Sequence, residues 1–185
     1  MLHTKPITKE MNDFSLIEDL YYTAFPKREQ VPMGILLSRT KNKDIRFEAY
    51  YDGNVFVGFT YVITNKDLTY LFYFATSAEV RGEGYGTQIL SHFKASYPNQ
   101  RLVLNCLAED ENAADNDMRK RRQNFYLRND YIYAGFSCKM NGNHVIAFTQ
   151  SDTITTEEFS AVFKKFWGPI WFILFKPKIE EKQSF

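Results

Sequence analysis

The residues with the clearest chemical signature form a glycine-rich stretch, residues 81–87, which reads Arg-Gly-Glu-Gly-Tyr-Gly-Thr. It lies between an apolar segment that is typical of a buried strand and a segment whose apolar residues recur at helical spacing. Glycines let the backbone approach a ligand closely and adopt positive φ angles. The first amides of a following helix lack internal partners and carry a partial positive charge, which suits a pyrophosphate. The stretch therefore predicts a phosphate-binding loop, to which Arg81 adds a charge and Thr87 a hydroxyl.

Two other kinds of phosphate loop are excluded by their spacing. A P-loop requires a lysine after its last glycine, whereas Thr87 follows Gly86 here. The dinucleotide fingerprint G-x-G-x-x-G requires its third glycine one residue later, and it follows the first strand of a parallel sheet. Two alternatives stay open: a flexible connection whose glycines only permit tight packing, and a binder of another nucleotide phosphate.

The loop and a second segment resemble a known family. Arg81, Gly84 and Gly86 form the pattern R-x-x-G-x-G, which resembles the acetyl-CoA signature of the GNAT acetyltransferase superfamily. Residues 122–136 are similar to the family's F-Y-x-x-x-G-F segment, a helix followed by a strand. Asp130-Tyr131 stands in place of its Gly-Phe, but an Asn-Asp pair can still form a left-handed turn. The similarity covers the order of elements up to residue 149 and leaves residues 150–185 without a counterpart in the minimal fold.

The resemblance implies a binding site for acetyl-CoA. The pantetheine arm would lie between two splayed parallel strands, 68–76 and 101–107, and pair with the backbone near Ala75 and Thr76. The Phe74 amide would hold the developing oxyanion of the thioester, an effect often worth ~3 kcal/mol. The pyrophosphate would be bound by the backbone of the glycine loop, that is by Arg81, Gly82, Glu83, Gly84, Tyr85, Gly86 and Thr87.

The resemblance also implies catalytic residues. Tyr126 falls where the family often places a tyrosine that protonates the departing thiolate, and a phenol with a pKa near ~10 suits that leaving group. The alternative for Tyr126 is a core aromatic residue beside Phe125. The family often has asparagine where this chain has Arg119, which puts that cofactor contact in doubt. Arg119 and Arg122 share a helix face with Tyr126, so either can meet a cofactor phosphate, or both can lie on a solvated helix surface.

No motif defines the general base. A substrate ammonium must lose a proton before it attacks, through a carboxylate, a histidine or a water chain. Glu109, just after the second splayed strand, is the first candidate, and Glu29 is the second. His144 is expected to be a strand residue without a chemical role, and Cys106 a small buried hydrophobic residue. No metal site is expected.

Hydrophobic periodicity predicts the elements that position these residues. A strand–helix–strand unit over 68–107 predicts a right-handed parallel strand pair inside an otherwise antiparallel sheet. The fold class is therefore mixed α/β, with a mostly antiparallel sheet, one splayed parallel pair and helices on both faces. Residues 1–149 are expected to form the acyltransferase domain, and residues 150–185 a helix–strand appendage packed on that domain or on a second copy. The expected helices are 11–24, 33–39, one between the glycine loop and Pro98, 117–128 and one from Thr155; the expected strands are 45–51, 55–64, 68–76, 101–107, 131–140, 144–149 and 171–175.

Composition restricts the class of protein. The chain has 185 residues, of which 44% are hydrophobic, and that is enough for one core. A net charge of +1 argues against a general nucleic-acid binder. Two cysteines cannot form a disulfide framework, so a reducing compartment and a cytoplasmic location are expected. The longest apolar run, residues 166–175, is too short to span a bilayer. It is expected to be a buried helix end and strand, with an exposed or membrane-touching tail as the alternative.

These features predict an N-acetyltransferase that moves an acetyl group from acetyl-CoA to a primary amine of a small molecule or peptide. The amine would attack directly in a ternary complex. The runner-up is a non-catalytic acyl-CoA-binding sensor or interaction module of the same fold. Neither a nucleic acid nor a membrane is an expected partner. A homodimer is one expected state, because the apolar tail can pair across a two-fold axis.

Overall fold

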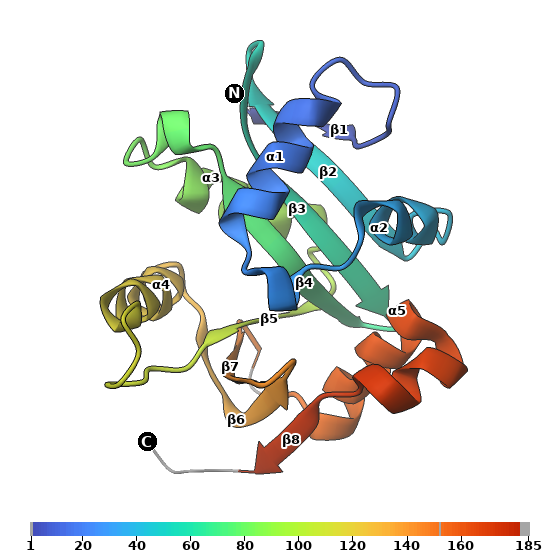
Figure 1. The fold of residues 1–185 in the computed structure, drawn as a ribbon, viewed down its shortest axis with the longest axis vertical. Coiled ribbons are helices and arrows are strands. Elements are labelled where there is room, and N and C mark those ends of the chain that lie inside the picture. The colour runs from blue at the N-terminus through green and yellow to red at the C-terminus, as the bar shows by residue number, and fades with distance from the viewer. Residues whose placement is uncertain (1, 152, 182–185) are drawn as a thin grey trace. The chain divides into compact units, whose positions relative to one another are not determined.

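Eight strands and five α-helices follow one another along the computed structural model, which describes residues 2–151 and 153–181 (Figure 1). Two short 3-10 helices, Lys27–Glu29 and Ala78–Val80, lie between them. The α-helices are α1 (Phe14–Ala24), α2 (Met33–Arg39), α3 (Tyr85–Ser96), α4 (Asn116–Arg128) and α5 (Thr156–Phe175). The strands are β1 (Leu2–Pro6), β2 (Ile45–Asp52), β3 (Val55–Asn65), β4 (Leu68–Thr76), β5 (Arg101–Leu107), β6 (Ile132–Met140), β7 (Asn143–Thr149) and β8 (Lys178–Glu181).

The strands are arranged in the order β1-β2-β3-β4-β5-β7-β6-β8. The β1–β2, β2–β3, β5–β7, β6–β7 and β6–β8 pairs are antiparallel. One pair is parallel, as the strand–helix–strand segment predicts, and the mixed α/β fold class is confirmed. The chain divides into two compact units, residues 1–64 with 71–98 and residues 65–70 with 99–185, so β4 contributes residues to both.

The core of the first unit is largely aromatic. α1 buries an apolar stripe that includes Tyr21, whose ring centroid lies 6.3 Å from Phe59 of β3 and 5.1 Å from Tyr73 of β4. α1 therefore lies across these strands (Figure 1). The Tyr21 hydroxyl accepts a hydrogen bond from the Val31 amide at 2.8 Å and donates one to the Val31 carbonyl at 3.0 Å. The Tyr73 hydroxyl donates to the Glu29 carbonyl at 2.6 Å, so hydrogen bonds from two buried tyrosines hold the segment between α1 and α2.

A glycine in β3 sets how closely β4 and α3 approach that strand. A Cβ atom at Gly58 would overlap the carbonyl oxygen of Ala75 and lie 3.0 Å from the Cα of Thr76. It would also lie 3.1 Å from Cδ1 of Ile89 in α3. The β2–β3 register shifts beside this position. The end of β4, which leads into the glycine loop, thus packs where only a glycine fits.

In the second unit, α5 begins as the sequence predicts and packs on strands. Thr155 and Glu158 form a capping box, which satisfies two amides at the helix start. Phe159 contacts Tyr70 of β4 and Phe136 of β6, with ring centroids 5.4 and 5.2 Å apart. The first half of α5 is therefore part of this core.

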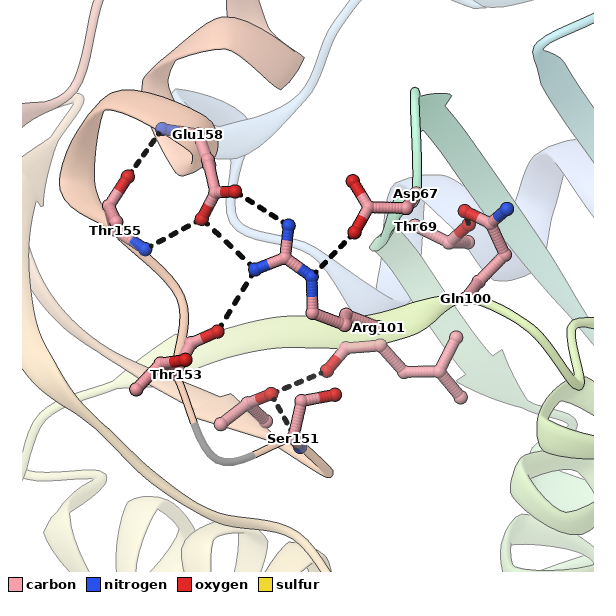
Figure 2. Close-up of polar contacts among 10 residues, drawn as sticks. Asp67, Thr69, Gln100, Arg101, Ser151, Thr153, Thr155 and Glu158 are labelled. Atoms are coloured by element: carbon pink, nitrogen blue, oxygen red, sulfur yellow. Dashed lines mark hydrogen bonds and ion pairs between the residues drawn. The ribbon is translucent and has the colours of Figure 1, made fainter.

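Arg101, at the start of β5, connects three segments of the second unit (Figure 2). Its guanidinium donates two hydrogen bonds to the Glu158 carboxylate, at 2.6 and 3.1 Å. It also donates to the Asp67 carboxylate at 2.8 Å and to the Thr153 carbonyl at 3.0 Å. The Arg101 guanidinium, followed by the Thr155 amide, lowers the pKa of the Glu158 carboxyl to about 2.

Replacement of Glu158 by glutamine should lower the free energy of unfolding by about 1 kcal/mol or less at neutral pH, because the pair is partly exposed to solvent. Glutamine also fits a capping box, so the change removes mainly the ion pair. Since the folded-state pKa is depressed, the stabilisation is present above the unfolded value of 4.5 and is lost as the pH falls through about 2. Denaturant unfolding at several pH values between 7 and 2 should show that the free energies of unfolding of the parent and of Glu158→Gln converge at low pH. Glu157→Gln removes a charge from the same helix turn, and an equal loss in that control would exclude the Arg101 pair as the cause.

The end of α5 differs from the expected buried strand. Residues 171–175 are helical, and Gly168, with φ 77°, breaks the helical conformation directly before Pro169. Proline has no amide hydrogen and its ring clashes with the preceding turn, so the helix is kinked here and then continues to Phe175. The side chains of this last part are largely exposed, whereas Phe159, Val162, Phe163 and Phe166 before the break are buried. The strand prediction for 171–175 is wrong, and the only strand after α5 in the described residues is β8.

Candidate functional site

The glycine loop joins β4 to α3 and is exposed over residues 81–84. Gly82 and Gly84 have positive φ angles of 87° and 81°, as the phosphate-loop prediction requires. A Cβ atom at either position would meet nothing within 4 Å. The glycines are therefore needed for their backbone conformation and leave open space beside the loop, and they are not needed for close internal packing. Gly86 differs, because it lies inside α3. The interpretation of the glycines as a mere packing device is therefore not supported at Gly82 and Gly84.

The N-terminus of α3 presents amides to this open space. Gly84 is the N-cap and supplies no side-chain cap, and the first closed helical bond runs from the Gln88 amide to the Gly84 carbonyl at 3.2 Å. The amides of Tyr85, Gly86 and Thr87 precede that bond, so they are available to an anion. The amides of Arg81 and Glu83 instead donate within the loop, to the carbonyls of Ala78 and Val80, over long distances of 3.4 Å.

Two predicted site residues anchor the loop in the first unit. Phe74 of β4 and Tyr85 of α3 both pack against one buried cluster of Tyr50, Val57, Val80 and Ile89. The Tyr85 hydroxyl donates to the Asp52 carboxylate at 3.0 Å, and this bond raises the pKa of Tyr85. Ala75 is buried and Thr76 is half-buried at the end of β4. The structure thus brings Phe74, Ala75, Thr76 and the glycine loop together in one unit.

Tyr126 lies on α4 in the second unit and is buried, with 7% of its surface exposed. Its ring is surrounded by Phe125, Tyr131 and Phe148, with centroids 5.4, 6.0 and 5.8 Å away. Burial raises the pKa of the Tyr126 phenol, the Cys106 thiol adds to this, and the positive charge of Arg122 opposes it. Tyr126 is therefore a protonated phenol at neutral pH in an aromatic setting, which fits both a general acid and a core residue.

The two arginines on α4 have different surroundings. Arg119 donates from Nε to Asp115 at 2.9 Å and from a terminal nitrogen to the Ala108 carbonyl at 3.1 Å. Its side chain is largely buried by these contacts, which leaves it oriented toward the end of β5. Arg122 is exposed, and its charge acts on both Tyr126 and Cys106. Of the two, Arg122 is the one whose charge is open to solvent.

Sequence reasoning missed Gln123. This buried side chain donates to the Leu107 carbonyl at 3.0 Å and accepts from the Tyr133 hydroxyl at 3.5 Å. With Arg119 on the Ala108 carbonyl, α4 thus satisfies two successive carbonyls at the carboxyl end of β5. The spacing of 119, 123 and 126 places these residues on one helix face, and a polar residue on that face was the available signal.

The candidate bases differ in their surroundings. Glu109 follows β5 and is exposed. Burial is the largest cause of the raised pKa of Tyr133, and the negative charge of Glu109 is the second. Glu29 lies in the first unit, at the end of the Lys27–Glu29 helix. His144 faces Ser137 at 2.9 Å and Glu180 at 3.7 Å on the surface, consistent with a strand residue. Burial raises the pKa of the Cys106 thiol to about 12, which makes it a poor nucleophile at neutral pH.

The predicted site residues therefore fall into two groups. The first unit holds Phe74 to Thr76 and the loop, and the second holds Glu109, Arg119, Arg122 and Tyr126. Within the described ranges, no cluster of three or more His, Cys, Asp or Glu residues could hold a metal ion. No helix in that part of the chain has both the length and the apolar character to cross a membrane.

Comparison with family models decides the family. The model of the acetyltransferase (GNAT) family matches residues 14–129, more than half of the chain. The chain belongs to the GNAT acetyltransferase family. The GNAT match contains the glycine loop and α4 with Tyr126 and ends one residue before Asp130, which adopts the expected left-handed conformation at φ 64°. No curated protein sequence matches the chain.

Solved structures share the GNAT fold at low sequence identity. A protein from Bacteroides thetaiotaomicron assigned to the GNAT family is 20% identical, with a TM-score of 0.70 over 94% of this chain and 98% of that one. An aminoglycoside 6'-N-acetyltransferase complexed with coenzyme A is 15% identical, with a TM-score of 0.62 over 80% and 95% of the two chains. A GNAT acetyltransferase from Elizabethkingia anophelis with acetyl-CoA bound is 14% identical, with a TM-score of 0.56 over 81% and 97%.

Proposed function

We propose that the chain transfers an acetyl group from acetyl-CoA to a primary amine of a small molecule or peptide. The observation that supports this most is the N-terminus of α3, which has no side-chain cap and follows Gly82 and Gly84, where the space is open. It lies inside the region that matches the GNAT family. Helix amides with no internal partner bind anions, and the pyrophosphate of coenzyme A is such an anion. Relatives with coenzyme A or acetyl-CoA bound support this donor. The buried, free Cys106 and Cys138 agree with a reducing compartment, so we place the reaction in the cytoplasm.

Each proposed residue has one role in a direct attack. The amides of Tyr85, Gly86 and Thr87 would bind the pyrophosphate, with Arg81 beside them. The Phe74 amide would stabilise the oxyanion that forms when the amine nitrogen bonds to the thioester carbon. Tyr126 would give its proton to the sulfur as the carbon–sulfur bond breaks, and it keeps that proton at neutral pH because burial raises its pKa. Glu109 would accept the amine proton, directly or through water.

The proposed pyrophosphate site at the N-terminus of α3 can be tested at Gly84, where the φ angle and the open space around an added side chain are both known. Gly84→Val should weaken acetyl-CoA binding at least tenfold, or ~1.4 kcal/mol, because its side chain fills the space in front of the helix amides. Valine is also strained at φ 81°, so Gly142→Val is the matched control: φ is 79°, a Cβ meets nothing within 4 Å, and the site is the β6–β7 turn. Calorimetric titration of both folded variants is the measurement. Unchanged affinity in Gly84→Val, or an equal loss in Gly142→Val, would contradict the assignment.

A non-catalytic acyl-CoA-binding module is the second candidate. It is favoured by Arg119, which takes the place of the asparagine that the family resemblance implies and is hydrogen-bonded to Asp115 and the Ala108 carbonyl. Release of the coenzyme A thiol across a panel of amines distinguishes the two. Binding of acetyl-CoA without thiol release on any amine would favour the module.

A further inference from the structure

The end of α5 carries the most exposed group of large apolar side chains in the described residues. After the break at Gly168 and Pro169, the helix continues only to Phe175. We call its exposed apolar side chains the α5 tip. Their exposed fractions are 77% for Ile170, 54% for Trp171, 71% for Ile173, 71% for Leu174 and 41% for Phe175.

The α5 tip is held in a fixed shape. Phe175 stacks on Trp167, which precedes the break, with ring centroids 4.4 Å apart and an interplanar angle of 22°. The first half of α5 is anchored in turn by Phe159 and Phe163 against Tyr70. The tip is therefore presented from the core of its unit and is not a loose chain end.

The exposed side chains of the tip cover a wide arc of the helix. At about 100° per residue, positions 170, 171, 173, 174 and 175 span an arc of about 200°. A helix that packs on one protein face buries a stripe of about 100°. Their exposed area is on the order of 600 Å², at or above the largest apolar patch of a typical monomer. Such a surface suits an apolar medium that surrounds the helix better than one flat partner.

The charged residues that directly flank the tip are lysines, and the nearest carboxylates in the sequence are Glu158 and Glu180. Between residues 159 and 179 the sequence has four lysines and no aspartate or glutamate. Two of the lysines precede the apolar run and two follow it, and the side chains of Lys164, Lys176 and Lys178 are exposed. Long lysine side chains can keep an ammonium group in a polar layer while the stem lies along apolar surface. The flanks of the tip are thus complementary to an anionic layer.

We propose that the α5 tip inserts into the interface of a bilayer that contains anionic lipids, with the flanking lysines on the lipid phosphates. Residues 169–175 span about 10 Å along the helix, which suits a short segment that lies in the interface plane with its apolar side chains buried about 5–10 Å. Tryptophan prefers that interface because its ring is apolar and its indole N–H is polar. The cytoplasmic leaflet, which is rich in anionic lipids, attracts such lysine clusters.

A second copy of the chain fits these observations less well. Because lysines flank the apolar run at both ends, a parallel or an antiparallel pair of tips brings lysines next to lysines. Like charges at an interface disfavour the pairing. A bilayer with anionic headgroups pairs both ends with opposite charge.

Flotation with lipid vesicles tests the proposal on the full chain. Vesicles of phosphatidylcholine with about 30% phosphatidylglycerol should bind the protein at least tenfold more strongly than phosphatidylcholine alone. Ile170→Ser/Ile173→Ser/Leu174→Ser should reduce binding to the anionic vesicles at least tenfold. Met118→Ser/Ile132→Ser is the matched control, since these side chains are 58% and 53% exposed elsewhere, and it should bind as the parent does. Lys176→Gln/Lys178→Gln keeps the apolar tip and should bind about tenfold more weakly.

Fluorescence reports the tip itself, because the chain has two tryptophans, Trp167 and Trp171. In Trp167→Phe, which retains an aromatic ring against Phe175, the Trp171 emission should shift to the blue on addition of the anionic vesicles. Absence of vesicle binding, or equal binding by the triple serine variant, would overturn the proposal. A concentration-dependent dimer in light scattering that the serine substitutions abolish, with no blue shift on vesicles, would assign the tip to a second copy instead.

Discussion

Replacement of Tyr126 by phenylalanine should lower kcat roughly 10- to 1000-fold with little change in acetyl-CoA affinity. The substitution keeps the ring, which packs among Phe125, Tyr131 and Phe148, and removes only the hydroxyl. If Tyr126 protonates the departing thiolate, the substitution removes an interaction that exists only in the transition state, so the binding of acetyl-CoA in the ground state should not change. The measurement is steady-state kinetics under conditions where the chemical step limits turnover.

Tyr131→Phe is the matched control for this prediction. Tyr131 is buried beside Tyr126, and its hydroxyl has no hydrogen-bond partner among the residues that the structure describes. Its removal should leave kcat within about twofold and should not destabilise the fold, since an unsatisfied buried hydroxyl is lost. Equal kcat in Tyr126→Phe and the parent would make Tyr126 a core aromatic residue. An equal fall in both variants would indicate a general effect on the aromatic cluster.

Phe163→Ala should lower the free energy of unfolding by about 3–5 kcal/mol. Phe163 is 1% exposed and packs against Tyr70 and Phe159, so its removal leaves a cavity in the core of the second unit. A loss of that size is a large fraction of the net stability of a domain. Denaturant unfolding at fixed temperature measures it.

Leu174→Ala lies in the same helix and serves as the control, because Leu174 is 71% exposed. Its effect should stay within about 0.5 kcal/mol, as is usual for surface positions. A small loss in Phe163→Ala would mean that α5 is dispensable for the fold. The division into a domain at 1–149 and an appendage at 150–185 stays a prediction, and this pair of variants bears on it.

Local sequence patterns determined most elements of this protein. β4 and β5 have the predicted bounds, and α2 occurs at 33–39 as expected. Two further elements follow local end signals: α5 begins at the capping box on Thr155, and α4 ends just before the left-handed turn at Asp130. The glycine loop was identified for a similar reason, because positive φ at Gly82 and Gly84 is a local demand that few other residues meet.

Elements with weak local signals were missed or misassigned. β1 and β8 are short strands, and they exist because β2 and β6 offer edges to pair with, which no periodicity in residues 2–6 or 178–181 reports. The run 171–175 is apolar and rich in aromatic residues, which fits a strand and a helix equally well. Here the chain is helical again after the break, because Pro169 fixes its φ angle at a value that suits the first turn of a helix.

At the candidate site, the sequence alone determined which residue types are available, and the tertiary structure decided what they contact. The sequence placed Arg119, Arg122 and Tyr126 on one face of a helix, and a helical wheel cannot say which neighbours that face meets. In the folded protein Arg119 donates to the Ala108 carbonyl and the buried Gln123 donates to the Leu107 carbonyl, while Arg122 stays exposed. The reason is that the carbonyls at the end of β5 need hydrogen-bond donors once they are buried, and only the packing of α4 against that strand end determines which side chains supply them.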